Sequence, residues 1–292
     1  MYNNNFFKNI SYKFFNLLPD KLFIQLKFFK NFHRLPNLKN PKTFSEKLQW
    51  LKLYDRNPYY TKLVDKYEVK KIVADIIGKK YIIPTLGVWD KAEDIDFDTL
   101  PNQFVLKATH DSGRVIICKD KEKLDKEWAK KEMAKSLKRD FYALTREWPY
   151  KNVPRRIIAE EFMEDAETKE LRDYKFFCIN GKVELLFIAT GRQTQEEPYF
   201  DFFDTDYNHL PFKHGHPNAP IKPIKPKNFD LMKIISEKLS LNLPQIRVDL
   251  YEINGNIYFG ELTLFHHSGM VQFDPPTWDY QLGELLKLPQ KQ

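Results

Sequence analysis

Polar residues recur at every second position in two segments of the C-terminal third. Arg247, Asp249 and Tyr251 alternate with apolar residues, which places their side chains on one face of a strand. Glu261 and Thr263 share a face of the next predicted strand. Two facing carboxylates repel unless a cation lies between them, and such oxygen ligands suit Mg²⁺. The pattern predicts a magnesium site; the alternative is a surface ladder in which Arg247 neutralises the acids.

The length of the turn decides whether the two acids meet. If residues 254–256 form a three-residue loop, counting back along both strands places Asp249 opposite Glu261 and Arg247 opposite Thr263. A two-residue loop would place Asp249 opposite Gly260 and separate the acids.

A lysine at the end of a buried strand is the second candidate. Lys107 lies near the end of the otherwise apolar run 104–108. The loop that follows contains Asp111, Ser112 and Gly113 before a second strand begins. A lysine can supply a point charge to phosphate oxygens, and a glycine lets backbone N–H groups close over them. The alternative is an ordinary hairpin whose lysine reaches solvent.

The third candidate is a strand that ends in acids. Residues 157–159 are apolar, and Glu160, Glu161, Phe162 and Met163 follow them. Such a segment can serve as a hinge whose backbone and carboxylate meet an adenine and its sugar. A solvated strand end is the default interpretation.

The elements that must position these residues mix helices with hairpins. Asn180-Gly181 is typical of a hairpin turn, and Thr43 or Ser45 can cap the first helix of the main region. The mixture, rich in antiparallel hairpins, predicts an α+β fold. Helices are expected at residues 42–54, 64–77, 121–144 and 229–241, and strands at 84–89, 104–108, 114–118, 156–162, 173–179, 182–189, 199–203, 247–253 and 257–263.

Bulk composition narrows the class of protein. The 292 residues carry a net charge of +7, with basic and acidic residues interleaved, and no zinc-finger, homeodomain or RNA-recognition signature is present. The two cysteines fit no disulfide framework. No apolar run approaches the roughly 20 residues that span a bilayer, and no signal peptide is evident. We therefore expect a cytoplasmic protein that binds no specific nucleic acid.

The N-terminal segment is basic and aromatic. Residues 6–32 contain eight phenylalanines among five lysines, and such a helix can lie on an anionic membrane surface, here the inner face. Pro19 and Pro36 cut the run into short helices, which favours the alternative that the aromatic side chains pack on the main domain.

Together the segments resemble the TupA-like ATP-grasp family, which is named for teichuronopeptide biosynthesis and found among bacterial capsule and cell-surface polysaccharide genes. The resemblance runs from about residue 41 to 270. It implies an ATP-grasp fold, with two α+β subdomains that clamp ATP behind a helical N-terminal segment. The implied divisions are 1–60, 61–103, the phosphate-loop subdomain 104–165 and the catalytic subdomain 166–292. The matching segments are residues 41–52, 65–67, 104–107, 160–162, 173–177 and 247–251.

The resemblance also implies roles for individual residues. Those that would bind ATP are Lys66, Lys107, Ser112, Gly113, Glu160, Glu161, Phe162, Met163, Asp173 and Lys175. Glu167 or Glu170 is an alternative to Asp173 at the ribose. Those that would act on the reacting phosphate are Arg247, Lys107 and Arg192, and those that would bind Mg²⁺ are Asp249, Glu261 and Thr263.

Two positions depart from the family pattern. Thr263 stands where ATP-grasp enzymes usually carry asparagine, and Asp111 stands where a glycine is expected. A threonine hydroxyl is a weaker metal ligand, and an aspartate makes closure of the phosphate loop less assured.

The function implied by the resemblance is a ligase that uses ATP and Mg²⁺ to join a carboxylate to an amine through an acyl phosphate. The carboxylate is expected on a uronic acid of a surface glycan or its precursor, and the amine on a small molecule. Rivals are a sugar kinase, a scaffold with a dead nucleotide site, and a glycosyltransferase that uses Asp204-Thr-Asp206. The sequence does not predict the oligomeric state.

Histidines cluster after the metal-binding strand and in the loop region before it. His266 and His267 would border the acceptor pocket, although two solvent-facing loop histidines are the favoured interpretation. His209, His214 and His216 lie in a proline-flanked loop whose sequence supplies no ligand geometry.

Overall fold

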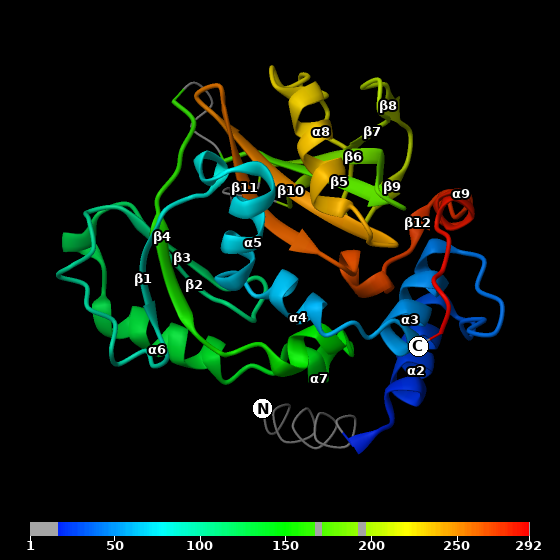
Figure 1. Ribbon diagram of the computed structural model, residues 1–292, viewed down its shortest axis with the longest axis horizontal. Helices are drawn as coiled ribbons and strands as arrows, with labels where there is room; N and C mark the ends of the chain where they lie inside the picture. Colours follow the sequence, from blue (N-terminus) through cyan, green and yellow to red (C-terminus); the bar gives the residue numbers. More distant parts are fainter. Residues whose placement is uncertain (1–16, 167–170, 192–196, 292) are drawn as a thin grey trace, which may run out of the picture.

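Two antiparallel sheets, of four and six strands, face each other (Figure 1). The computed structural model describes residues 17–166, 171–191 and 197–291. Every pairing of named strands in this part of the chain is antiparallel, and helices cover the outer faces, so the α+β prediction is confirmed. No helix among the described residues is both long and apolar enough to cross a membrane.

The smaller sheet has the order β1-β4-β2-β3. Its strands are β1 (Thr85–Trp89), β2 (Phe104–Ala108), β3 (Val115–Cys118) and β4 (Ile157–Glu161). Phe104 and Leu106 point to a core that helix α6 (Lys126–Leu137) covers with Ala129 and Met133. Ile117, which alternates with the buried residues of β3, is half-exposed toward the second sheet.

The larger sheet has the order β11-β10-β5-β6-β7-β8. Helix α8 (Phe229–Ser240) packs on one face, where Phe229 meets Phe176 at a ring separation of 6.1 Å. The other face carries the polar residues of β5 and β10. The strands are β5 (Asp173–Ile179), β6 (Lys182–Thr190), β7 (Tyr199–Phe203), β8 (His209–Leu210), β10 (Gln245–Ile253) and β11 (Asn256–Thr263); a separate pair is β9 (Lys213–His214) with β12 (Phe273–Asp274).

Aspartates set where several helices begin. The predicted helix 64–77 begins later than expected, as α5 (Glu68–Ile77), because Asp65 accepts the backbone N–H groups of its first turn. The short helix α4 (Tyr59–Val64), which the sequence did not predict, precedes it. The predicted helix 121–144 is η2 (Lys121–Lys123), α6 and α7 (Phe141–Thr145), with Asp125 and Asp140 as N-caps. Trp128 of α6 is half-exposed.

The remaining helices join the N- and C-terminal parts of the chain. Helix α3 (Phe44–Tyr54) begins with a capping box, in which Thr43 and Glu46 bond each other's backbone N–H groups. Helix α2 (Asp20–Phe32) packs Phe23, Ile24 and Phe28 against Met270, so packing of the aromatic segment is confirmed within residues 17–32. The other segments are η1 (Lys79–Tyr81), η3 (Trp148–Asn152), η4 (His266–Gly269) and α9 (Thr277–Leu285).

Candidate functional site

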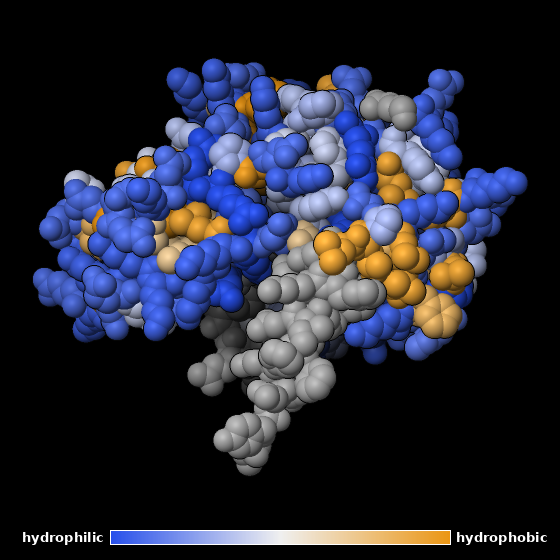
Figure 2. Space-filling view, turned by 90° about the horizontal axis from the view of Figure 1, so that it is seen from below, coloured by the Kyte–Doolittle hydropathy of each residue, from blue (hydrophilic) through white to orange (hydrophobic). Residues whose placement is uncertain are grey.

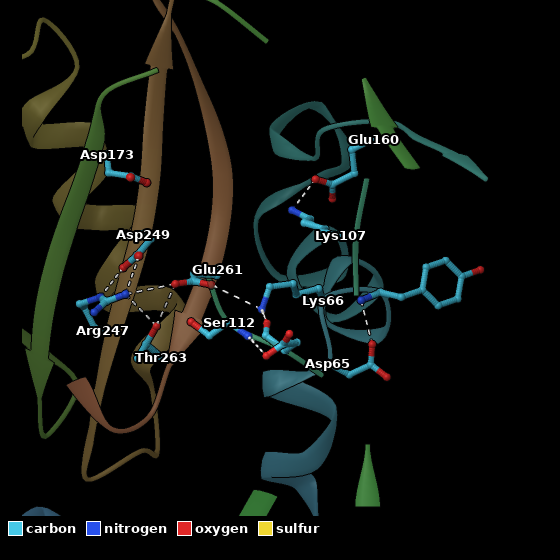
Figure 3. Close-up of polar contacts among 12 residues, drawn as sticks. Asp65, Lys66, Lys107, Ser112, Glu160, Asp173, Arg247, Asp249, Glu261 and Thr263 are labelled. Carbon is cyan, nitrogen blue, oxygen red and sulfur yellow. Dashed lines mark hydrogen bonds and ion pairs between the residues drawn. The ribbon is translucent and has the colours of Figure 1, made fainter. Parts of the chain in front are cut away.

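A cavity of about 360 Å³ lies between the two sheets. Both sheets supply its walls, and the close-up in Figure 3 shows side chains from the two sides converging on it. All ten residues expected to bind ATP line this cavity: Lys66, Lys107, Ser112, Gly113, Glu160, Glu161, Phe162, Met163, Asp173 and Lys175. Asp249 and Glu261 line it as well.

The two predicted metal-binding acids are direct partners across β10 and β11. Asp249 lies opposite Glu261, and Lys175 of β5 lies opposite Asp249 on its other side. Arg247 lies opposite Thr263. Cross-strand partners share a face of the sheet, so the acids meet as the sequence predicted.

The route to this register differs from the one that the sequence suggested. The turn holds only two residues between the paired Ile253 and Asn256, which would separate the acids in a regular ladder. A bulge at Gly260 adds one residue to β11 and restores the pairing of Asp249 with Glu261. A Cβ at Gly260 would lie 3.0 Å from the carbonyl oxygen of Asp249, so the close approach of the two backbones there requires glycine.

Arg247 holds the acidic pair together. Its Nε and Nη2 donate to the two carboxylate oxygens of Asp249, each at 2.7 Å, in a bidentate pair. Nη2 also donates to Glu261 at 3.2 Å and to the Thr263 hydroxyl at 2.9 Å. Nη1 donates to Nδ1 of His266 at 2.6 Å. The guanidinium is therefore fixed in one orientation beside the cavity.

Glu261 faces the cavity with an ionised carboxylate. Burial would raise its pKa, but Lys66, Lys175 and Arg247 together hold the pKa well below its usual value. Lys66 Nζ lies 3.8 Å from Oε2 of Glu261. Lys175 pairs with Asp249 and, at 3.4 Å, with Asp173. Carboxylates of this kind, with the Thr263 hydroxyl beside them, are a donor set that fits Mg²⁺.

Glu160 bridges two lysines at the opposite wall. It pairs with Lys70 at 2.5 Å and with Lys107. Burial opposes ionisation of Glu160, but both lysines hold its pKa below the usual value. Lys70 was missed in the sequence, because nothing in the helical spacing of α5 indicates that it reaches β4.

Asp111 anchors the phosphate loop. Its carboxylate accepts from Ser136 at 2.7 Å and from Arg139 at 2.8 Å, which ties the loop to α6 and the segment after it. Its carbonyl oxygen accepts from Lys66 at 2.9 Å. Gly113, at a φ of 86°, takes the left-handed turn that follows. The aspartate thus has a structural role in place of the expected glycine.

Part of the cavity wall is apolar. Ile83, Val105, Ile117, Met163 and Leu171 form this part of the wall. A flat base fits between such side chains, while Lys66, Lys107 and Lys175 lie where anionic groups would be stabilised. The residues present therefore fit both ATP and Mg²⁺.

The histidines differ from expectation. His266 is buried rather than solvent-facing, and His214, His266 and His267 bring one ring nitrogen each within 4.8 Å of one another, so His214 does belong to a cluster. His266 accepts from Arg247 through Nδ1, so the neutral ring keeps its proton on Nε2. A protonated nitrogen beside a guanidinium does not suit a cation, and we assign no metal there.

Other predicted residues fall elsewhere. Asp204 accepts the backbone N–H groups of Asp206 and Asn208, so the pattern 204–206 is a turn between β7 and β8. Cys118 and Cys178 are buried and free. Arg192, Glu167 and Glu170 lie outside the described residues.

Two sheets that enclose a cavity with lysines, paired acids and apolar side chains have the arrangement of the ATP-grasp class. The chain belongs to the TupA-like ATP-grasp family, whose sequence model matches residues 46–287. No curated protein sequence matches it significantly.

Solved structures of several ligases are similar to this chain at low identity. D-alanine–D-alanine ligase from Bacillus anthracis, complexed with ATP, is 15% identical with a TM-score of 0.40, over 69% of this chain and 53% of that one. An L-amino acid ligase from Bacillus licheniformis is 14% identical with a TM-score of 0.45, over 83% and 51%. The ATP-grasp ligase PsnB, complexed with minimal precursor, Mg and ADP, is 14% identical with a TM-score of 0.38, over 75% and 57%. The alignments thus cover little more than half the length of each ligase.

Proposed function

We propose that the protein is an ATP- and Mg²⁺-dependent ligase that joins a carboxylate to an amine through an acyl phosphate. The observation that carries this proposal is the facing pair of Asp249 and Glu261, held by Arg247 in a cavity that also contains Lys66 and Lys107. Membership of an ATP-grasp family supports it.

The proposed reaction has two steps. A carboxylate oxygen bonds to the γ-phosphorus of ATP, the bond to the ADP oxygen breaks, and ADP leaves. An amine then attacks the acyl carbon, inorganic phosphate leaves, and the amine nitrogen loses a proton to solvent. Bound Mg²⁺ neutralises charge on the phosphate oxygens.

The residues of the cavity would bind and orient the reactants. Lys66 and Lys107 hold the phosphates, while Arg247 and Lys175 stabilise negative charge that develops at the transferred phosphoryl group. Asp249, Glu261 and Thr263 would hold the metal. Arg192, outside the described residues, is proposed to approach the acyl phosphate. Residues 160–163 contact the base, and Asp173 contacts the ribose.

The proposed substrates follow from the family alone. The name of the family refers to a cell-surface polymer, so the acceptor is proposed to be a uronic acid of a surface polysaccharide or its precursor, and the donor an amino acid or amino alcohol. The reaction would then take place in the cytoplasm.

An array of uronic acids crossed with small amines tests the reaction class. The expected result is release of ADP and phosphate only in wells that contain both partners, with an amide product of matching mass. Phosphorylated sugar formed without an amine would establish a kinase instead. ATP binding without turnover in every well would establish a scaffold.

A further inference from the structure

The excess positive charge of the protein is confined to its N-terminal segment. Of the 47 basic and 40 acidic residues in the chain, eight basic and one acidic fall within residues 1–42. The remaining 250 residues therefore carry 39 of each sign and are neutral overall. Such asymmetry indicates that one end of the molecule meets an anionic partner.

Helix α2 exposes an apolar stripe in this basic segment. Leu22, Leu26, Phe29 and the following Leu35 are each between 42% and 58% exposed. Figure 2 shows this face, where apolar side chains gather at the end that carries α2 while most of the view is hydrophilic. The opposite face of α2 is already buried on the main body, so the stripe is not needed for packing.

Lysines flank the stripe on both sides. At about 100° per residue, Leu22, Leu26 and Phe29 fall within an arc of about 60°, with Lys21 on one side and Lys30 on the other. Both lysines are exposed. Lys27, by contrast, turns inward and donates to the carbonyl oxygen of Leu144 at 2.7 Å. An apolar stripe bordered by exposed lysines is the pattern of a helix that lies in a membrane interface.

We propose that the exposed face of α2, formed by Leu22, Leu26, Phe29, Lys21 and Lys30, docks the protein on an anionic lipid surface. The leucines and the phenylalanine enter the headgroup boundary, and the lysines meet lipid phosphates. A nucleic acid would satisfy the charge but would leave the apolar stripe in water. The proposal concerns attachment and does not depend on the reaction catalysed.

Flotation of the full chain with vesicles tests the docking. Vesicles of phosphatidylcholine alone are compared with vesicles that also contain phosphatidylglycerol, at low and high salt. The expected result is binding to the anionic vesicles that weakens as salt rises. Equal binding to both vesicles, or binding to neither, would overturn the proposal.

Two sets of variants locate the surface. The first combines Leu22→Ser, Leu26→Ser and Phe29→Ser, with Ile221→Ser plus Ile224→Ser as the control, because those isoleucines are exposed elsewhere. The docking variant is expected to lose at least about tenfold in vesicle affinity, since three apolar side chains no longer enter the interface. The control is expected to bind like the unaltered protein.

The second set combines Lys21→Gln and Lys30→Gln, with Lys71→Gln plus Lys131→Gln as a control of equal charge. Two lysines at an anionic surface contribute about fivefold each, so a loss of about 25-fold is expected for the first pair only. Equal losses in both pairs would contradict a defined docking face. Duplex DNA that binds more tightly than the vesicles, without sensitivity to the serine substitutions, would instead establish a nucleic-acid surface. Thermal unfolding of each variant checks that the fold is kept.

Discussion

Arg247 has partners on three sides, and they explain why its position is so well defined. Asp249 takes a bidentate pair, Thr263 and Glu261 accept from Nη2, and His266 accepts from Nη1. A fixed guanidinium can stabilise developing charge without reorganising, which is the larger part of electrostatic catalysis.

Glu261→Gln tests the metal-binding pair. The substitution keeps the shape but removes the charge that the cavity would offer to Mg²⁺, so kcat is expected to fall by about 10²- to 10³-fold. The measurement is steady-state ADP release with the substrates found in the array. Glu127→Gln, an exposed acid on α6, is the matched control; a comparable fall in both variants would contradict the assignment.

His214 tests the buried histidine cluster through pH. Burial, with His267 adding to it, lowers the pKa of His214 to about 3. Below the ordinary pKa of about 6.5, this histidine binds a proton in the unfolded chain but not in the folded protein. The free energy of unfolding therefore decreases as the pH falls from about 6.5 toward 3.

In His214→Gln, the free energy of unfolding is therefore expected to fall less steeply with decreasing pH than in the unaltered protein. The two slopes should differ by about 1.4 kcal/mol per pH unit. Urea titrations between these two pH values measure the slope. His33→Asn is the control. The side chain of His33 is exposed, and its backbone has a left-handed conformation that asparagine tolerates. Identical slopes in His214→Gln and the unaltered protein would show that His214 is not buried neutral.

At the scale of elements, the bulge in β11 decides whether the site forms. The alternation of Arg247, Asp249 and Tyr251 was enough to place them on one face, because a strand has a period of two. The pairing with Glu261 was predicted with the wrong turn length, since the bulge at Gly260 depends on backbone contact that alternation does not encode.

Other features that the sequence did not predict also depend on contacts that the spacing of residues does not encode. The burial of His266 depends on rings from distant strands, with Phe177 of β5 at 4.9 Å and His214 of β9 at 5.0 Å. The late start of α5 and the division of the predicted helix 121–144 came from Asp65 and Asp140, whose side chains compete locally for backbone N–H groups. Local patterns therefore predicted most strands, and the family resemblance supplied most of the cavity residues. Side-chain caps and long-range contacts set the remaining details.

Gly260→Ala is expected to disturb the bulge. The new methyl group would lie 3.0 Å from both the Asp249 carbonyl oxygen and the Tyr251 ring, so the free energy of unfolding should fall by about 1–3 kcal/mol. ATP binding in the presence of Mg²⁺ should weaken as well, because the acids no longer face each other. Urea denaturation and calorimetric titration measure the two effects.

Gly255→Asn serves as the control for this substitution. Gly255 also lies in the hairpin, at a φ of 77°, but a Cβ there would meet nothing within 4 Å, and asparagine tolerates positive φ. If Gly260→Ala and Gly255→Asn lose equal stability, the close approach at the bulge is not the cause.

At the scale of the whole molecule, the cavity is formed only when the two sheets face each other. A ligand that contacts both sheets binds the folded protein and not the unfolded chain, and so stabilises the arrangement.

ATP with Mg²⁺ is expected to raise the free energy of unfolding by about 2.7 kcal/mol at a concentration 100 times its Kd. ATP with a chelator should give a smaller increase at the same concentration, because the acids then repel the phosphates. Thermal unfolding scans measure both. In Glu261→Gln the increment due to Mg²⁺ should disappear; its persistence would place the metal elsewhere.

The ion pairs of Asp249 also limit what a metal can do by itself. Arg247 and Lys175 already neutralise the Asp249 carboxylate. A divalent ion without a nucleotide would therefore have to compete with two positively charged side chains of the protein itself. A bound triphosphate would change that competition, because its oxygens would offer Lys175 an anionic partner in addition to Asp249 and Asp173. For the proposed enzyme we therefore expect magnesium to bind together with the nucleotide and not before it.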